Sequence, residues 1–219
     1  MNRRHFSLTL AAAASLAALG AWPSATWAQG AKYTEGKEYT RLPQPVPLTD
    51  LGRKVDVVEF FWYGCPHCNA FEPTLEPWVA NLPKDQVRFR RIHVAFNALQ
   101  EIHQRLFCTL ESMGLVDKLH AKVFAAFHVH HKPINSVEDA VQFATANGVD
   151  PQKFRAAWDS FAVSTKVKQY AAAQDAYRID SVPTLAVQGH YLTSPADAGG
   201  PQQALDVTNH LIDLARKGA

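Results

Sequence analysis

Two cysteines separated by two residues constrain this chain more than any other feature of its sequence. Cys65 and Cys68 follow a mostly apolar run, 55–61, that is typical of a buried strand, and Gly64 lies between that run and a predicted helix. Positions i and i+3 of a helix lie on one face, so the two sulfurs can form a disulfide. A disulfide that closes so short a loop restrains the unfolded chain very little. The pair is therefore predicted to open and close rather than to staple the fold.

The start of the predicted helix explains the order of residues in Cys65-Pro66-His67-Cys68. Free N–H groups and the positive end of the helix dipole stabilise an anion there, so the pKa of Cys65 is expected to fall. The backbone N–H groups of His67 and Cys68 are the expected donors, and a protonated His67 would add positive charge. Pro66 suits the first helical position because it has no N–H. A stable Cys65 thiolate makes the disulfide a strong oxidant, and the deeper Cys68 is the expected resolving sulfur.

The Cys-Pro-His-Cys sequence after an aromatic strand end, with Val182-Pro183-Thr184 far downstream, resembles the DsbA family of thiol:disulfide oxidoreductases. The resemblance covers most of the chain after residue 40. It implies an α/β, thioredoxin-like fold and a redox-active Cys65–Cys68 disulfide with no other cofactor. It also implies a cis peptide bond before Pro183 that faces the cysteines, with the backbone of Val182 available to an extended substrate peptide.

Glu59 is a carboxylate inside the predicted strand. One interpretation is that it reaches solvent near the strand end. The other is that it is buried beneath the disulfide, where it tunes Cys68 or takes its proton. The family carries a glutamate at this place, so the resemblance favours burial. Arg91, in the predicted strand 87–96, matches a basic family position and is a candidate partner for Glu59.

Residues 1–28 have the features of an export signal. Two arginines precede an apolar segment, 8–21, and Thr26-Trp27-Ala28 supplies small residues for cleavage near Ala28. The apolar segment is too short and too rich in alanine to be a convincing membrane span. Loss of the signal takes the formal net charge from +2 to about 0, so nothing indicates nucleic-acid binding. We expect a monomeric protein in the periplasm of a Gram-negative bacterium.

Residues 97–165 show helical patterns that a minimal thioredoxin fold lacks. We interpret them as an inserted all-helical subdomain within a discontinuous thioredoxin-like domain, 29–96 and 166–219. Four amphipathic helices with buried aromatic stripes are expected in the insertion. The fourth opens at Asp150-Pro151 and presents three aromatic residues: Phe154, Trp158 and Phe161.

Two further expectations concern other helices. A long helix that starts at Ser164 leads back to the first domain. In the helix after Cys68, Pro73 and Pro77 predict a kink or a break, because proline removes a backbone hydrogen bond and its ring clashes with the preceding turn.

The remaining cysteine and a histidine cluster are interpreted without special chemistry. Cys108 is expected to be a small buried hydrophobic residue, with a third redox thiol as the alternative. Cys65, His67 and Cys68 offer three zinc ligands, but no second Cys-x-x-Cys completes a site, so no metal is expected. The dipole at a helix C-terminus accounts for a cluster of histidines: His128, His130 and His131.

The sequence therefore predicts an enzyme that donates the Cys65–Cys68 disulfide to reduced, unfolded exported proteins. The family resemblance implies that a DsbB-like inner-membrane quinone reductase reoxidises it. One alternative is a reductase or isomerase of the same fold; the Pro66-His67 pair weighs against a reductase, and the lack of a recognisable dimerisation segment weighs against an isomerase. The other alternative is a peptide-binding or metal-binding module whose cysteines are incidental.

Overall fold

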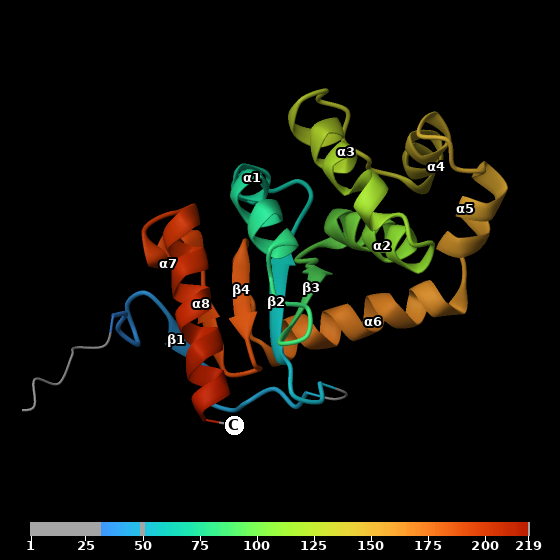
Figure 1. Ribbon diagram of the computed structural model, residues 1–219. Helices are drawn as coiled ribbons and strands as arrows, with labels where there is room; N and C mark the ends of the chain where they lie inside the picture. The colour runs from blue at the N-terminus through green and yellow to red at the C-terminus, as the bar shows by residue number, and fades with distance from the viewer. Residues whose placement is uncertain (1–31, 49–50, 219) are drawn as a thin grey trace, which may run out of the picture. The chain divides into compact units, whose positions relative to one another are not determined.

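A mixed five-stranded sheet organises the fold in the order β1-β5-β4-β2-β3 (Figure 1). The structure, a computed structural model, describes residues 32–48 and 51–218; the expected export signal lies outside them. β2 pairs with β3 in parallel and with β4 in the antiparallel sense, so the strand before the cysteines lies inside the sheet. The strands are Thr40–Arg41 (β1), Val55–Phe61 (β2), Val87–His93 (β3), Thr184–Val187 (β4) and Tyr191–Thr193 (β5).

Every residue of β2 is buried, as its apolar run predicts. Successive side chains of a strand point to opposite faces of the sheet. Val57 packs in a cluster with Leu211 on one face, and Phe60 packs against the ring of Tyr177 on the other. By this alternation Glu59 shares the face of Val57, and Asp56 shares the face of Phe60.

The helices α1 (Pro66–Ala80) and α8 (Pro201–Lys217) lie together over one face of the sheet, with the short α7 (Pro195–Ala198) before α8 (Figure 1). Phe71 and Leu75 of α1 are buried against Leu205 of α8. Helix α1 continues through Pro73 and Pro77, so the break considered from the sequence is absent. Burial of the α1 side chains offsets the hydrogen bonds that the two prolines remove.

Five helices lie between β3 and β4, which confirms the helical insertion. Helices α2 and α6 contact each other and β3. The division at 165/166 stays a prediction, and α6 spans that point. The helices are Ala98–Ser112 (α2), Val116–His128 (α3), Val137–Ala146 (α4), Pro151–Trp158 (α5) and Phe161–Ala176 (α6). Within residues 32–48 and 51–218, none of the helices combines the length and the apolar character that a bilayer span requires.

The expectation for the fourth inserted helix is wrong at Phe161. Helix α5 ends at Trp158, and Ser160 caps a new helix by accepting a hydrogen bond from the backbone N–H of Val163. Phe154 and Trp158 are buried as expected, whereas Phe161 is 87% exposed. The long helix that leads back to the first domain, α6, accordingly starts at Phe161 rather than at Ser164, because the serine cap interrupts the aromatic stripe.

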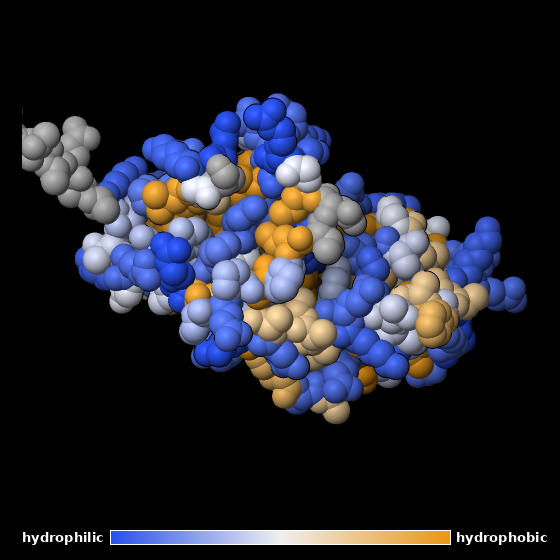
Figure 2. Space-filling view, turned by 90° about the horizontal axis from the view of Figure 1, so that it is seen from below, coloured by the Kyte–Doolittle hydropathy of each residue, from blue (hydrophilic) through white to orange (hydrophobic). Residues whose placement is uncertain are grey.

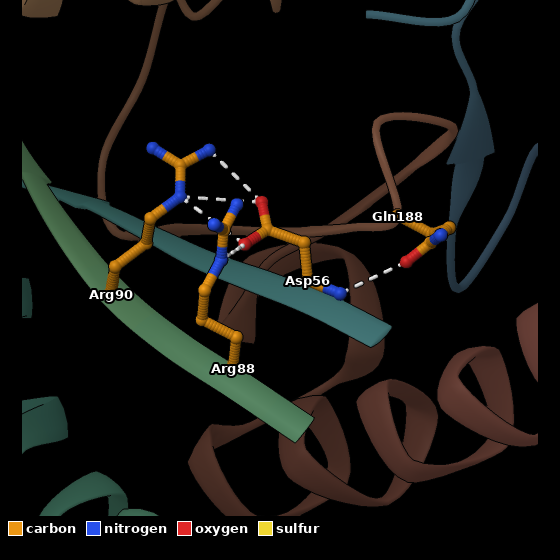
Figure 3. Close-up of polar contacts among 4 residues, drawn as sticks. All are labelled: Asp56, Arg88, Arg90 and Gln188. Carbon is orange, nitrogen blue, oxygen red and sulfur yellow. Dashed lines mark hydrogen bonds and ion pairs between the residues drawn. The ribbon is translucent and has the colours of Figure 1, made fainter. Parts of the chain in front are cut away.

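Asp56 is a buried carboxylate that the sequence analysis did not single out (Figure 3). Its Oδ1 accepts a hydrogen bond from Nε of Arg88 at 2.7 Å, and its Oδ2 accepts one from Nη2 of Arg90 at 2.9 Å. Its backbone N–H donates to Oε1 of Gln188 at 2.9 Å. These bonds tie the start of β2 to β3 and to the β4–β5 turn, away from the cysteines.

Figure 2 shows the molecule from below, where the surface is mostly hydrophilic with separate hydrophobic patches.

Candidate active site

Cys65, the first of the two cysteines, lies beside the Val182-Pro183 motif at the amino end of α1. Cys65 is the N-cap of α1 and Pro66 its first residue, as predicted. The peptide bond between Val182 and Pro183 is cis, which confirms that expectation. Sγ of Cys65 donates a hydrogen bond to the carbonyl oxygen of Val182 at 3.5 Å, across 117 positions of sequence. The fold thus brings the two motifs together.

The pKa of Cys65 is lowered to about 6. The largest cause is a hydrogen bond from the Cys68 thiol, which burial of Cys65 partly opposes. The backbone N–H groups of Cys68 and His67 follow, as expected from the sequence, and the charge of His67 contributes least. The thiol–thiol hydrogen bond is not predictable from the sequence, because it depends on the side-chain geometry of the first turn.

Cys68 has the opposite environment. Its side chain is 0% exposed, and burial raises its pKa far above that of a free thiol. Its hydrogen bond to Cys65 and the charge of Glu59 act in the same direction. All three cysteines of the chain are free thiols in this structure. The two sulfurs are therefore chemically unequal, one ionising readily and the other holding its proton.

Glu59 is fully buried, so the interpretation in which it reaches solvent is wrong. Nε of Arg91 donates a hydrogen bond to Oε2 of Glu59 at 2.8 Å, which confirms the predicted pair. Oε1 of Glu59 has no hydrogen-bond partner. Burial raises the pKa of Glu59 to about 7; Arg91 lowers it and the nearby Glu72 raises it. A carboxyl group with this pKa exchanges a proton near neutral pH.

Arg91 also contacts two glutamates of α1 that the sequence analysis did not identify. Its Nη2 lies 2.8 Å from Oε1 of Glu76 and 3.5 Å from Oε2 of Glu72. Nε2 of His120, from α3, lies 3.5 Å from the same oxygen of Glu72. Burial raises the pKa of Glu72 to about 7, and burial together with Arg91 lowers the pKa of His120 to about 4. The spacing of Cys68, Glu72 and Glu76 places them on one helical face, which is the sequence signal for this cluster.

Three histidines hold Tyr63, which immediately precedes Gly64 and Cys65. The backbone N–H of Tyr63 donates to Nε2 of His93 at 3.1 Å, and its carbonyl oxygen accepts from Nε2 of His128 at 2.8 Å. Its hydroxyl shares a hydrogen bond with Nδ1 of His120 at 2.9 Å. His128 therefore has a specific structural partner in addition to the helix dipole.

Trp62 and Gly64 pack closely beside Cys65. Nε1 of Trp62 donates to Nδ1 of His103 at 2.9 Å. A β-carbon at position 64 would overlap the indole ring of Trp62, so glycine is required there for this close approach. The indole and the glycine together shape the loop that ends at the N-cap of α1.

Cys108 behaves as the small buried hydrophobic residue that the sequence predicts. Its side chain is 0% exposed, and burial, followed by the charge of Glu111, raises its pKa to about 12. A thiol that keeps its proton and is sheltered from solvent is a poor nucleophile.

Known proteins are similar to this chain in sequence. The model of the DSBA-like thioredoxin domain family matches residues 56–206. The thiol:disulfide interchange protein DsbA of Pseudomonas aeruginosa is 42% identical over 192 residues, which are 88% of this chain and 90% of that protein. DsbA of Bordetella parapertussis is 40% identical over 209 residues, or 95% of this chain and 96% of that protein.

The fold agrees with these relatives. The crystal structure of Pseudomonas aeruginosa DsbA matches this one with a TM-score of 0.81 at 41% identity, covering 85% of this chain and 96% of that one. The residues that the family model matches include the paired cysteines, the helical insertion and the strands β3 to β5. On this evidence the chain belongs to the DSBA-like thioredoxin domain family and is a thiol:disulfide oxidoreductase.

Proposed function

We propose that this protein oxidises pairs of thiols in reduced, unfolded exported proteins, with a Cys65–Cys68 disulfide as the oxidant. A substrate thiolate attacks Sγ of Cys65, the bond between Cys65 and Cys68 breaks, and Cys68 leaves with the electron pair and takes up a proton. A second substrate thiolate then attacks the substrate sulfur of this mixed disulfide, and Cys65 leaves as a thiolate. The products are a substrate disulfide and a reduced cysteine pair, so two electrons pass from substrate to enzyme.

The contrast between the two thiols carries this proposal. The pKa of Cys65 is lowered to about 6, whereas that of Cys68 is raised. A stable Cys65 thiolate leaves readily from the mixed disulfide and favours the reduced enzyme, which makes the disulfide oxidising. Cys68 is completely buried, so an incoming thiolate reaches Cys65 instead.

The surrounding residues take supporting roles in the proposal. Glu59, with a pKa of about 7, exchanges a proton with Cys68 when the disulfide opens and closes. Pro66 and His67 tune Cys65 through the first turn of α1. The backbone of Val182, held by the cis bond to Pro183 beside Cys65, hydrogen-bonds an extended substrate peptide.

The reduced enzyme has to be oxidised again. We assign this step to a DsbB-like inner-membrane quinone reductase, which takes the two electrons to quinone. The expected compartment is the periplasm, after cleavage of the export signal near Ala28, because thiols are kept reduced in the cytoplasm. The enzyme is expected to work as a monomer and without any cofactor besides its own disulfide.

One assay tests the oxidase against its alternatives. Oxidised protein is mixed with a reduced, unfolded substrate, and free substrate thiols are counted with time. The oxidase predicts rapid thiol loss that the Cys65→Ser variant abolishes and the Cys108→Ser variant retains. Faster reduction of a disulfide substrate than oxidation of a dithiol would favour the reductase, and shuffling of existing disulfides would favour the isomerase. No thiol exchange would favour a binding module and reject the proposal.

A further inference from the structure

Side chains from two helices converge beside Arg91, outside the cysteine pair. Glu72 and Glu76 come from α1, and His120 comes from α3. One ligand atom from each of the three lies within 4.8 Å of the others. Among residues 32–48 and 51–218, this is the one group of three histidine, cysteine, aspartate or glutamate side chains that converges in this way.

Two buried atoms in this cluster lack hydrogen-bond partners. Nε2 of His120 has none, although the side chain is only 5% exposed, and it faces Oε2 of Glu72 at 3.5 Å. Oε1 of Glu72 is also buried without a partner. Buried polar atoms are normally satisfied, so two unpaired atoms on side chains whose ligand atoms lie within 4.8 Å of one another indicate a missing ligand.

The charges favour a cation as that ligand. Arg91 is the cation that contacts Glu59, Glu72 and Glu76, which are three carboxylates. A divalent cation would bring the ionised cluster to neutrality. Nη2 of Arg91 now contacts Oε1 of Glu76 and Oε2 of Glu72, so an incoming ion has to displace this group from the two carboxylates. Glu76 is 53% exposed, which gives an ion access from solvent.

We propose that Glu72, Glu76 and His120 bind a divalent transition-metal ion of the Zn²⁺ type. A histidine nitrogen with two carboxylate oxygens suits Zn²⁺ better than Mg²⁺ or Ca²⁺, which prefer oxygen ligands throughout. Three protein ligands leave a fourth position for water. In the tautomer whose Nδ1–H donates to the hydroxyl of Tyr63, 2.9 Å away, the lone pair of His120 is on Nε2, where it can bind the ion. The site is separate from the thiol chemistry proposed above and does not depend on it.

The test measures Zn²⁺ binding by calorimetry and Co²⁺ binding by its visible absorption. The full chain is used as a Cys65→Ala/Cys68→Ala variant, so that the paired thiols cannot supply ligands. One ion per chain is expected, with a tetrahedral Co²⁺ spectrum. In that background Glu76→Gln weakens the affinity at least about tenfold, as the loss of a ligand should cost no less than the loss of an outer partner. The Glu76 side chain is half exposed, so this variant is expected to fold.

Two more variants test whether His120 is a ligand and whether the loss of an unrelated carboxylate affects binding. His120→Asn keeps an amide group near the Nδ1 position to hydrogen-bond Tyr63 but removes Nε2, and it should weaken binding as much as Glu76→Gln does. Glu138→Gln removes an exposed carboxylate that pairs with Arg155, and it should leave binding unchanged. Absence of saturable binding in the cysteine-free background would overturn the proposal. Equal affinity in the Glu76→Gln and Glu138→Gln variants, or loss of binding in a His130→Gln/His131→Gln variant, would also overturn it.

Discussion

The Cys68 thiol donates a hydrogen bond to Sγ of Cys65, and this is the largest contribution to the lowered pKa of Cys65. Cys68 therefore has a second role besides forming the disulfide with Cys65. In the reduced state it stabilises the thiolate of its partner, and that stability is what makes the disulfide oxidising. The reactivity of one sulfur thus depends on the other keeping its proton.

Removal of the Cys68 thiol should raise the pKa of Cys65 more than removal of the His67 ring. In Cys68→Ala the lost hydrogen bond to a charged group should raise it by roughly one to two units. Cys68→Ser keeps a donor and should have a smaller effect, as should His67→Ser, because the His67 charge contributes least. The far-ultraviolet absorbance of the thiolate, followed with pH on the reduced proteins, measures each value. A larger shift in His67→Ser than in Cys68→Ala would reverse this order of causes.

The sequence predicts best the parts of the site that depend on local structure. Cys65 as N-cap, Pro66 as first helical residue and a fully buried β2 all follow from short-range patterns. The cis bond before Pro183 came instead from the family resemblance. Local rules also mislead at Phe161, where a single serine cap starts a new helix.

Contacts between distant segments were not predictable in the same way. The hydrogen bond between Tyr63 and His120 joins residues 57 positions apart, and neither has a neighbouring pattern that marks the other. Asp56 lies in a run that is apolar apart from itself and Glu59, and only the pairing with strand β3 brings its two arginines beside it. Glu59 and Arg91 were paired correctly because the family resemblance supplied what the spacing does not.

Glu59→Gln should stabilise the protein at neutral and alkaline pH. The folded-state pKa of Glu59 is raised to about 7 from an ordinary value of 4.5, so the folded state binds the proton more tightly than the unfolded state. Stability should therefore fall as pH rises from 4.5 to about 7, and the glutamine variant should escape this loss. Its gain should be near zero at about pH 4.5 and roughly 3 kcal/mol at about pH 8.

Urea unfolding of the two proteins in the same redox state measures this gain. Glu138→Gln, which alters an exposed carboxylate, serves as the control and should show no comparable pH dependence. A glutamine variant that is less stable than the parent at about pH 8 would mean that the Arg91 pair outweighs the cost of burying the charge.

His93 should make the protein sensitive to acid. Burial lowers its pKa well below the ordinary value of 6.5. Just below pH 6.5 the unfolded state therefore binds a proton on this side chain, and the folded state does not. Stability is therefore lost as pH falls below 6.5. His93→Gln keeps an acceptor for the N–H of Tyr63 but cannot titrate. This variant should be less stable at about pH 7, through lost packing against Phe61, and the deficit should shrink steadily as pH falls from 6.5 towards about pH 5. Urea unfolding at both pH values tests this, and a constant deficit would show that His93 does not titrate on unfolding.

Gly64→Ala should destabilise the loop before Cys65. The added methyl group overlaps the indole of Trp62, so the ring, which donates a hydrogen bond to His103, must shift. Overpacking of this kind costs roughly 1–3 kcal/mol. Gly218→Ala is the matched control, because a β-carbon there meets only ordinary contacts near the end of α8, and its stability should change by less than about 0.5 kcal/mol. Urea unfolding gives both values, and near-ultraviolet circular dichroism reports on the tryptophan. Equal stability of the two variants with an unchanged tryptophan signal would show that the indole of Trp62 tolerates a β-carbon at position 64. Glycine would then not be required for the close packing of the two residues.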